Sequence, residues 1–154
     1  MKNMRRVDRQ MEDKQALELL LKGEYGILAT VDSHQQPYGI PLNYVLIDNS
    51  LYFHCAVEGH KLQNVGENSK GCFTVVASAQ LLPEAFSTAY ESIIAFGEVS
   101  VIKDDEEKTM VLRELVKKYS GDFIPEGDHY IERAKHNTIA LKMIIQSFTG
   151  KHRA

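Results

Sequence analysis

Apolar residues recur along most of the chain in short runs or with a period of two, a pattern that predicts β-strands. Residues 138–147 show it most clearly, because Ile139, Leu141, Met143 and Ile145 alternate with the residues between them. Polar turns such as 32–37 and 48–50 separate the first runs and predict that these strands form a meander. We expect six strands, at residues 25–31, 38–47, 51–56, 71–78, 92–102 and 138–147.

Helical periodicity is confined to fewer segments. Residues 8–22 are predicted to form a helix that ends at Gly23, and 58–68 a Gly-containing loop followed by a short helix. The clearest helix spans 104–119, where Asp104 and Glu107 have capping-box spacing. One apolar stripe marks its buried face, formed by Val111, Leu112, Leu115, Val116 and Tyr119.

Glycine and proline residues predict irregular structure at three places. Pro41 lies inside the second predicted strand, which therefore should be an edge strand or bulged. Gly97, inside the fifth, predicts a bulge or a close backbone approach. Residues 121–127 hold two glycines and Pro125, so we predict a loop there.

Strands in hairpin order outnumber the helices, which favours an antiparallel barrel over a parallel βαβ fold. The expected class is mainly β, or α+β, with peripheral helices. With 154 residues, the chain is predicted to form one domain, residues 1–154.

Composition excludes several functional classes. The net charge of -3 lacks the field of a general nucleic-acid binder, and no apolar run reaches the roughly 18 residues that cross a membrane. Residues 1–13 are polar, so we expect a cytoplasmic protein without a secretion signal. Cys55 and Cys72 lie in apolar runs and are predicted to be buried thiols, and their spacing does not suit a zinc site.

The densest polar cluster, residues 52–61, ends the third strand. Gly59 followed by His60 and Lys61 is a pattern that can bring backbone amides and a cation to a phosphate. A solvated loop explains the same residues. His54 can be a hydrogen-bonded core histidine or a catalytic group, and the period of two places it on the face of Tyr52.

Two further groups admit two interpretations. Tyr90 and Ser92 lie at the start of the fifth strand. Their hydroxyls could bind a phosphate or ribityl chain, or they could only cap the end of the strand. Arg5, Arg6 and Arg9 form a basic cluster, which is either a solvated helix start or a phosphate contact across a dimer.

Five segments in this order resemble one protein family. The chain is similar to the nitroimidazole-resistance (Nim) proteins, a branch of the pyridoxamine 5'-phosphate oxidase-like flavoproteins, over nearly its whole length. The segments that carry the resemblance are 4–9, 26–31 with 37–45, 51–56 with 59–61, 90–97 and 149–151.

The resemblance implies a six-stranded split β-barrel that forms a homodimer with one FMN at each subunit interface. It implies that His54, Gly59, His60 and Lys61 lie near the flavin phosphate, with His54 as a proton donor or substrate orienter. Other matching positions would contact the cofactor: Thr30, Leu42, Asn43, Tyr44, Tyr90 and Ser92. Cys55 stands where the family usually has glycine.

Several functions fit this resemblance. The first is an FMN oxidoreductase that reduces a small electrophile such as a nitroimidazole, and the second is a flavin carrier or sensor without turnover. Pyridoxamine-phosphate oxidase activity ranks lowest, because the chain has few arginines for a substrate phosphate. A haem-binding relative stays open, since His54 or His60 could ligate iron.

Overall fold

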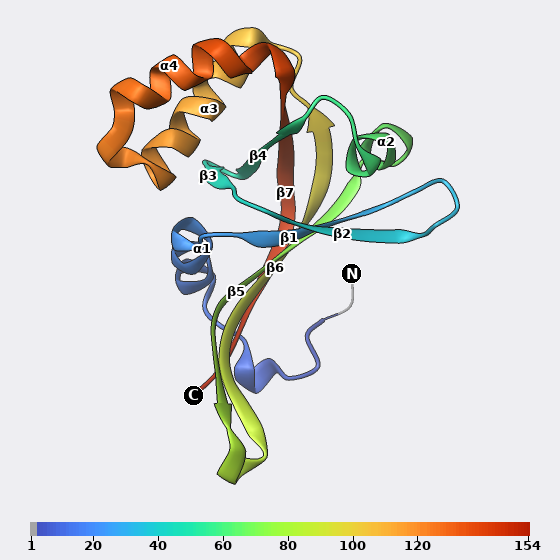
Figure 1. Cartoon of the computed structure of the whole chain (residues 1–154). Helices are drawn as coiled ribbons and strands as arrows, with labels where there is room; N and C mark the ends of the chain where they lie inside the picture. Colours follow the sequence, from blue (N-terminus) through green and yellow to red (C-terminus); the bar gives the residue numbers. More distant parts are fainter. Residues whose placement is uncertain (1–2) are drawn as a thin grey trace.

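A computed structural model describes residues 3–154 as one antiparallel sheet that curls into a split barrel (Figure 1). The strand order across the sheet is β2-β1-β5-β6-β7-β4-β3. The strands are β1 Gly26–Val31, β2 Pro37–Leu42, β3 Val45–Ile47, β4 Ser50–Ala56, β5 Lys70–Leu82, β6 Ser87–Val101 and β7 Thr138–Arg153. The predicted class is confirmed, with seven strands in place of six.

The extra strand arises because the second predicted strand, 38–47, is two strands. β2 pairs with β1 and β3 pairs with β4, at opposite edges of the sheet. The connection through Asn43 and Tyr44 passes from one edge to the other, so the predicted meander is present as two antiparallel hairpins, β1–β2 and β3–β4, and only its continuous second strand is wrong. Pro41 lies in the edge strand β2, as predicted.

Two apolar clusters stabilise the fold. Phe53, Phe73, Leu141 and Met143 belong to the larger cluster, in the barrel interior. Tyr52, on the opposite face of β4, belongs to the smaller cluster between the sheet and the helices. The predicted alternation along β7 is confirmed, because its inward residues are buried or pack against the larger cluster.

Within residues 3–154, four α-helices surround the barrel: α1 Asp13–Lys22, α2 His60–Glu67, α3 Asp105–Tyr119 and α4 Ile124–Ala134. The Asp104 carboxylate accepts a hydrogen bond from the Glu107 amide at 2.9 Å and caps α3 as predicted. The predicted helix 8–22 is shorter, because Met11 is buried and its N–H donates to Gly150 O on β7, 2.9 Å away. Residues 7–9 form only a 3-10 turn.

The loop predicted at 121–127 is also wrong, since most of it belongs to α4. Pro125 lies in the first turn, where a missing N–H costs nothing. Gly127 allows α4 to approach α3, because a Cβ there would lie 2.4 Å from Val116 Cγ1. α3 and α4 therefore pack as a helical hairpin over the sheet (Figure 1).

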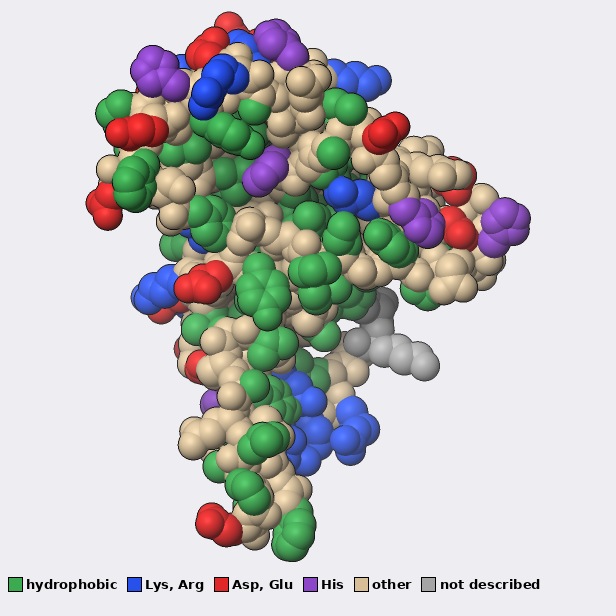
Figure 2. Space-filling view, in the orientation of Figure 1, with side chains coloured by type: hydrophobic (Ala, Val, Ile, Leu, Met, Phe, Trp, Pro, Cys, Tyr) green, Lys and Arg blue, Asp and Glu red, His purple; other side chains and the backbone are tan. Residues whose placement is uncertain are grey.

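β5 and β6 extend beyond their predicted bounds and form a hairpin arm that projects from the barrel (Figure 1). Apolar side chains lie exposed on this arm, including Leu81 and Phe86 (Figure 2). The predicted bulge at Gly97 is confirmed by a register shift between β6 and β7. None of the helices within residues 3–154 is long and apolar enough to span a membrane.

Candidate functional site

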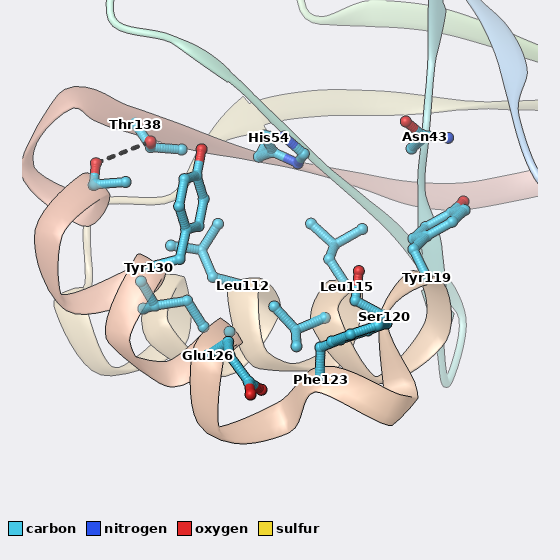
Figure 3. A pocket seen from close by; sticks show the side chains of 14 residues that line it. Asn43, His54, Leu112, Leu115, Tyr119, Ser120, Phe123, Glu126, Tyr130 and Thr138 are labelled. Atoms are coloured by element: carbon cyan, nitrogen blue, oxygen red, sulfur yellow. Dashed lines mark hydrogen bonds between the residues drawn. The ribbon is translucent and has the colours of Figure 1, made fainter.

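A cavity of about 370 Å³ lies between the outer face of the sheet and the α3–α4 hairpin (Figure 3). Its floor comes from apolar and aromatic side chains of the two helices, and its roof from the sheet and the β2–β3 connection. The residues that contribute most of the lining are Leu112, Leu115, Tyr119, Phe123, Tyr130 and Ile131 from the helical hairpin, with Asn43, His54 and Thr138 opposite them.

His54 points from β4 into this cavity (Figure 3). It shares the outer face of the strand with Tyr52, as the period of two predicts, while Phe53 faces the barrel interior. Partial burial lowers the pKa of the imidazole, and the charge of Lys61 lowers it further. Near neutral pH the ring is therefore uncharged, with one nitrogen as a donor and the other as an acceptor.

The turn before α2 places Gly59, His60 and Lys61 together. Gly59 has φ 143°, a conformation that favours glycine, and open space surrounds the position of a Cβ there. In the first turn of α2 the Leu62 amide donates to Gly59 O at 3.1 Å, whereas the amides of His60 and Lys61 have no acceptor within the helix and can bind an anion. Lys61 forms no ion pair among residues 3–154, and its charge acts on both His54 and Cys55.

His60 stacks against Tyr38 of β2, with ring centroids 4.4 Å apart. This contact fixes α2 against the β1–β2 hairpin. Inside the barrel, Asn64 of α2 donates to the Thr30 hydroxyl at 3.1 Å. The Thr30 side chain is buried in that contact, and Leu42 is partly buried against the barrel core.

Asn43 and Tyr44 occupy the connection that crosses between the sheet edges. Asn43 reaches the cavity roof and donates to Glu24 O at 3.0 Å. Tyr44 is fully buried and its hydroxyl donates to Leu20 O, so neither its ring nor its backbone is exposed to a ligand in this chain. Burial raises the pKa of the Tyr44 phenol far above its ordinary value.

The end of α3 holds this connection in place. The Tyr119 hydroxyl accepts a hydrogen bond from the Tyr44 amide at 3.0 Å and lies 2.6 Å from Glu24 O. Lys118 Nζ donates to Tyr44 O at 2.9 Å, and burial lowers its pKa to about 8. The sequence indicated Tyr119 only as part of an apolar stripe. Nothing in its spacing pointed to this polar role.

Tyr90 and Ser92 lie far from His54 within one chain. Ser92 pairs with Lys151 on β7, whereas His54 pairs with Ala140. The two positions on β7 are eleven residues apart, which corresponds to roughly 35 Å along the strand at about 3.3 Å per residue. Along β7, Tyr90 and Ser92 are thus separated from His54.

The surroundings of Tyr90 are basic. Lys151 Nζ lies 5.7 Å from the Tyr90 ring centroid, and Figure 2 shows Lys and Arg side chains gathered beside the arm. Burial raises the pKa of the Tyr90 phenol, but hydrogen bonds with Arg9 and Lys151 outweigh it and lower the pKa overall. Arg6 pairs with Asp8 at 2.5 Å and its charge also acts on Tyr90, whereas Arg9 forms a hydrogen bond with Tyr90.

The two cysteines are free thiols. Cys55 is buried and Cys72 is half-buried, and burial raises the pKa of both. A raised pKa leaves these thiols protonated and poorly nucleophilic near neutral pH. Within residues 3–154, no group of three His, Cys, Asp or Glu side chains is placed to hold a metal ion.

Known structures share this fold. A protein from Bacteroides thetaiotaomicron, named as a candidate 5-nitroimidazole antibiotic resistance protein, is 26% identical with a TM-score of 0.74, over 92% of this chain and 85% of its own. The FAD and haem binding protein from Mycobacterium smegmatis is 21% identical with a TM-score of 0.79, over 94% and 73%. A FAD-binding protein from Mesorhizobium loti is 18% identical with a TM-score of 0.68, over 95% and 98%.

No functionally curated protein matches the chain. The sequence profile of the pyridoxamine 5'-phosphate oxidase family, however, matches residues 12–152, almost the whole chain. The split-barrel topology agrees with that match. The protein therefore belongs to the pyridoxamine 5'-phosphate oxidase family.

Proposed function

We propose that this protein binds FMN and acts as an oxidoreductase on a small electrophile. The observation that carries the proposal is the turn before α2, where Lys61, which has no ion pair among residues 3–154, follows Gly59 at the helix N-terminus. A phosphate fits that arrangement, because it would gain both backbone donors and a cation. The FAD-binding proteins with the same fold support a flavin as the ligand.

From that phosphate position, the flavin ring would extend toward His54 and Asn43 at the cavity. When bound, FMN would supply the redox chemistry, and the protein would position it and tune its potential. His54, as a neutral imidazole, would donate one N–H hydrogen bond and orient the substrate. The same ring could hold a proton on that nitrogen for a developing anion.

A second copy of the chain would complete the site. The basic group with Tyr90, Ser92 and Lys151 lies about 35 Å along β7 from His54, farther than one FMN molecule reaches. A homodimer would bring this group of one subunit to the phosphate turn of the other. The exposed apolar side chains of the arm, Leu81 and Phe86, support such an interface.

The cavity argues against two alternatives. Among residues 3–154, no Lys or Arg lines it, so it does not suit the phosphate of pyridoxamine phosphate. Its volume of about 370 Å³ is near the lower end of the roughly 300–1,000 Å³ typical of ligand sites, which is small for a porphyrin.

The test separates an oxidoreductase from a carrier. FMN-loaded protein is mixed with NADH or NADPH and a 5-nitroimidazole, and nucleotide oxidation is followed by absorbance. We expect turnover that His54→Ala slows by about 10²–10⁴-fold, with FMN occupancy unchanged. Bound FMN without turnover for any donor and acceptor would indicate the carrier, and absent FMN would refute the proposal.

A further inference from the structure

The cavity between β4 and the α3–α4 hairpin has a shape that favours flat molecules. Phe123 and Tyr130 from the helices form its aromatic wall, and Leu112 and Leu115 form its apolar floor (Figure 3). Aromatic rings prefer stacked or edge-on contact with other rings. The volume of about 370 Å³ suits one or two fused rings.

Charge narrows the class of ligand further. Glu126 is the only carboxylate among the lining residues, all of which lie within the described part of the chain, and no Lys or Arg accompanies it. Glu126 lies on α4 at the rim of the cavity (Figure 3). An anionic ligand would lose hydration among apolar walls, meet a like charge and find no cation, so the cavity excludes it.

Two hydrogen-bond donors are available inside. Among residues 3–154, neither the His54 ring nor the Tyr130 hydroxyl has a hydrogen-bond partner, and both point toward the same part of the cavity (Figure 3). Both residues are exposed on the cavity side, Tyr130 by 62%, so a ligand with an acceptor oxygen can replace water on both donors at once. A nitro or carbonyl oxygen on an aromatic ring supplies such an acceptor.

We propose that this cavity binds uncharged, planar aromatic molecules of one or two rings that carry an exocyclic oxygen, and that it discriminates against anionic ones. The proposal names a substrate class for the proposed oxidoreductase, and the cavity's role as the substrate site rests on that proposed function. α4, which the sequence did not predict, then becomes the element that determines specificity.

The chain contains no tryptophan, so one introduced tryptophan can report on the cavity. Phe123→Trp places it in the wall, and Leu21→Trp, on the exposed face of α1 outside the cavity, is the matched control. Tryptophan fluorescence quenching is measured with 1-nitronaphthalene and with 5-nitronaphthalene-1-sulfonate, on the protein as purified. We expect saturable quenching of Phe123→Trp by the neutral probe, at least tenfold weaker binding of the sulfonate, and only collisional quenching of Leu21→Trp.

Three further changes in the Phe123→Trp background locate the binding. Ala134→Phe fills the cavity and should raise the Kd of the neutral probe at least tenfold, whereas Ala85→Phe on the arm should leave it unchanged. Glu126→Gln keeps the cavity shape, so it should tighten sulfonate binding at least threefold without affecting the neutral probe.

Linear quenching that is equal in both tryptophan variants would overturn the inference, as would equal affinities for the two probes. FMN content, measured by visible absorbance on the same samples, separates this inference from the proposed function. Saturable probe binding without FMN would refute only the flavoprotein. FMN binding without saturable probe binding would refute only the cavity inference.

Discussion

Lys61 is the residue on which the phosphate site depends most. It is a cation without an ionic partner among residues 3–154, next to the open turn at Gly59. Lys61→Ala should weaken FMN binding by about 10- to 150-fold, because one charge-assisted contact contributes about 1.5–3 kcal/mol. Titration of apo-protein with FMN measures this. The exposed Lys103→Ala is the control, and equal FMN affinity in both variants would exclude Lys61 from the site.

His54 should make stability depend on pH. Its folded pKa lies below the ordinary value of 6.5, so the unfolded chain takes up the proton first as pH falls. The free energy of unfolding should therefore decrease as pH falls from 6.5 to the folded pKa, and level off below it. Urea unfolding at pH 7.5 and at pH 5.5 tests this against His54→Gln. The wild type should lose more stability than the variant, and equal losses would contradict the assignment.

The sequence predicted the positions of some site residues but not of others. The face of His54 follows from the period of two, because β4 keeps that period throughout. The burial of Tyr44 does not, because it depends on Leu20 and Tyr119, which reach it from distant parts of the chain. Tyr130 was not predicted as a site residue, because residues 121–127 were predicted to form a loop and the helix that carries Tyr130 was not predicted.

At the scale of elements, Gly97 lets β6 pass close to β7. A Cβ there would lie 2.0 Å from Ile144 O, and a backbone atom in a strand pair cannot move aside easily. Gly97→Ala should lower the free energy of unfolding by about 2–3 kcal/mol. Gly66→Ala in α2 is the matched control, since nothing lies within 4 Å of its Cβ, and it should stabilise by about 0.5–1 kcal/mol. Urea denaturation of both variants checks the opposite signs, and a neutral Gly97→Ala would contradict this packing.

Elements with local signals were predicted well and those set by tertiary contacts were not. α3 has its own cap and apolar stripe, so its bounds follow from the sequence. α4 combines Pro125 with Gly127, which read locally as a loop, yet Gly127 is needed for contact with Val116 of α3. The division between β2 and β3 likewise arises because β2 pairs with β1 and β3 pairs with β4. Residues 38–47 contain no turn signal that would predict this division.

In the whole molecule, β7 pairs with β4 near His54 at one end and with β6 near Tyr90 and Ser92 at the other. Its sixteen residues, Thr138–Arg153, run from the region opposite Ala56 to the region opposite Tyr90. One chain therefore presents each half of the proposed site at a different end. The central claim is that two copies join these halves around FMN.

Sedimentation velocity, followed at the visible absorption band of oxidised flavin, tests this claim most directly. Only protein-bound flavin sediments, so one measurement reports both the cofactor and the size of the species that carries it. We expect the flavin absorbance to move with a particle of about twice the 17.4 kDa chain mass. Flavin on a 17.4 kDa monomer, or flavin absorbance that stays behind while the protein sediments, would contradict it.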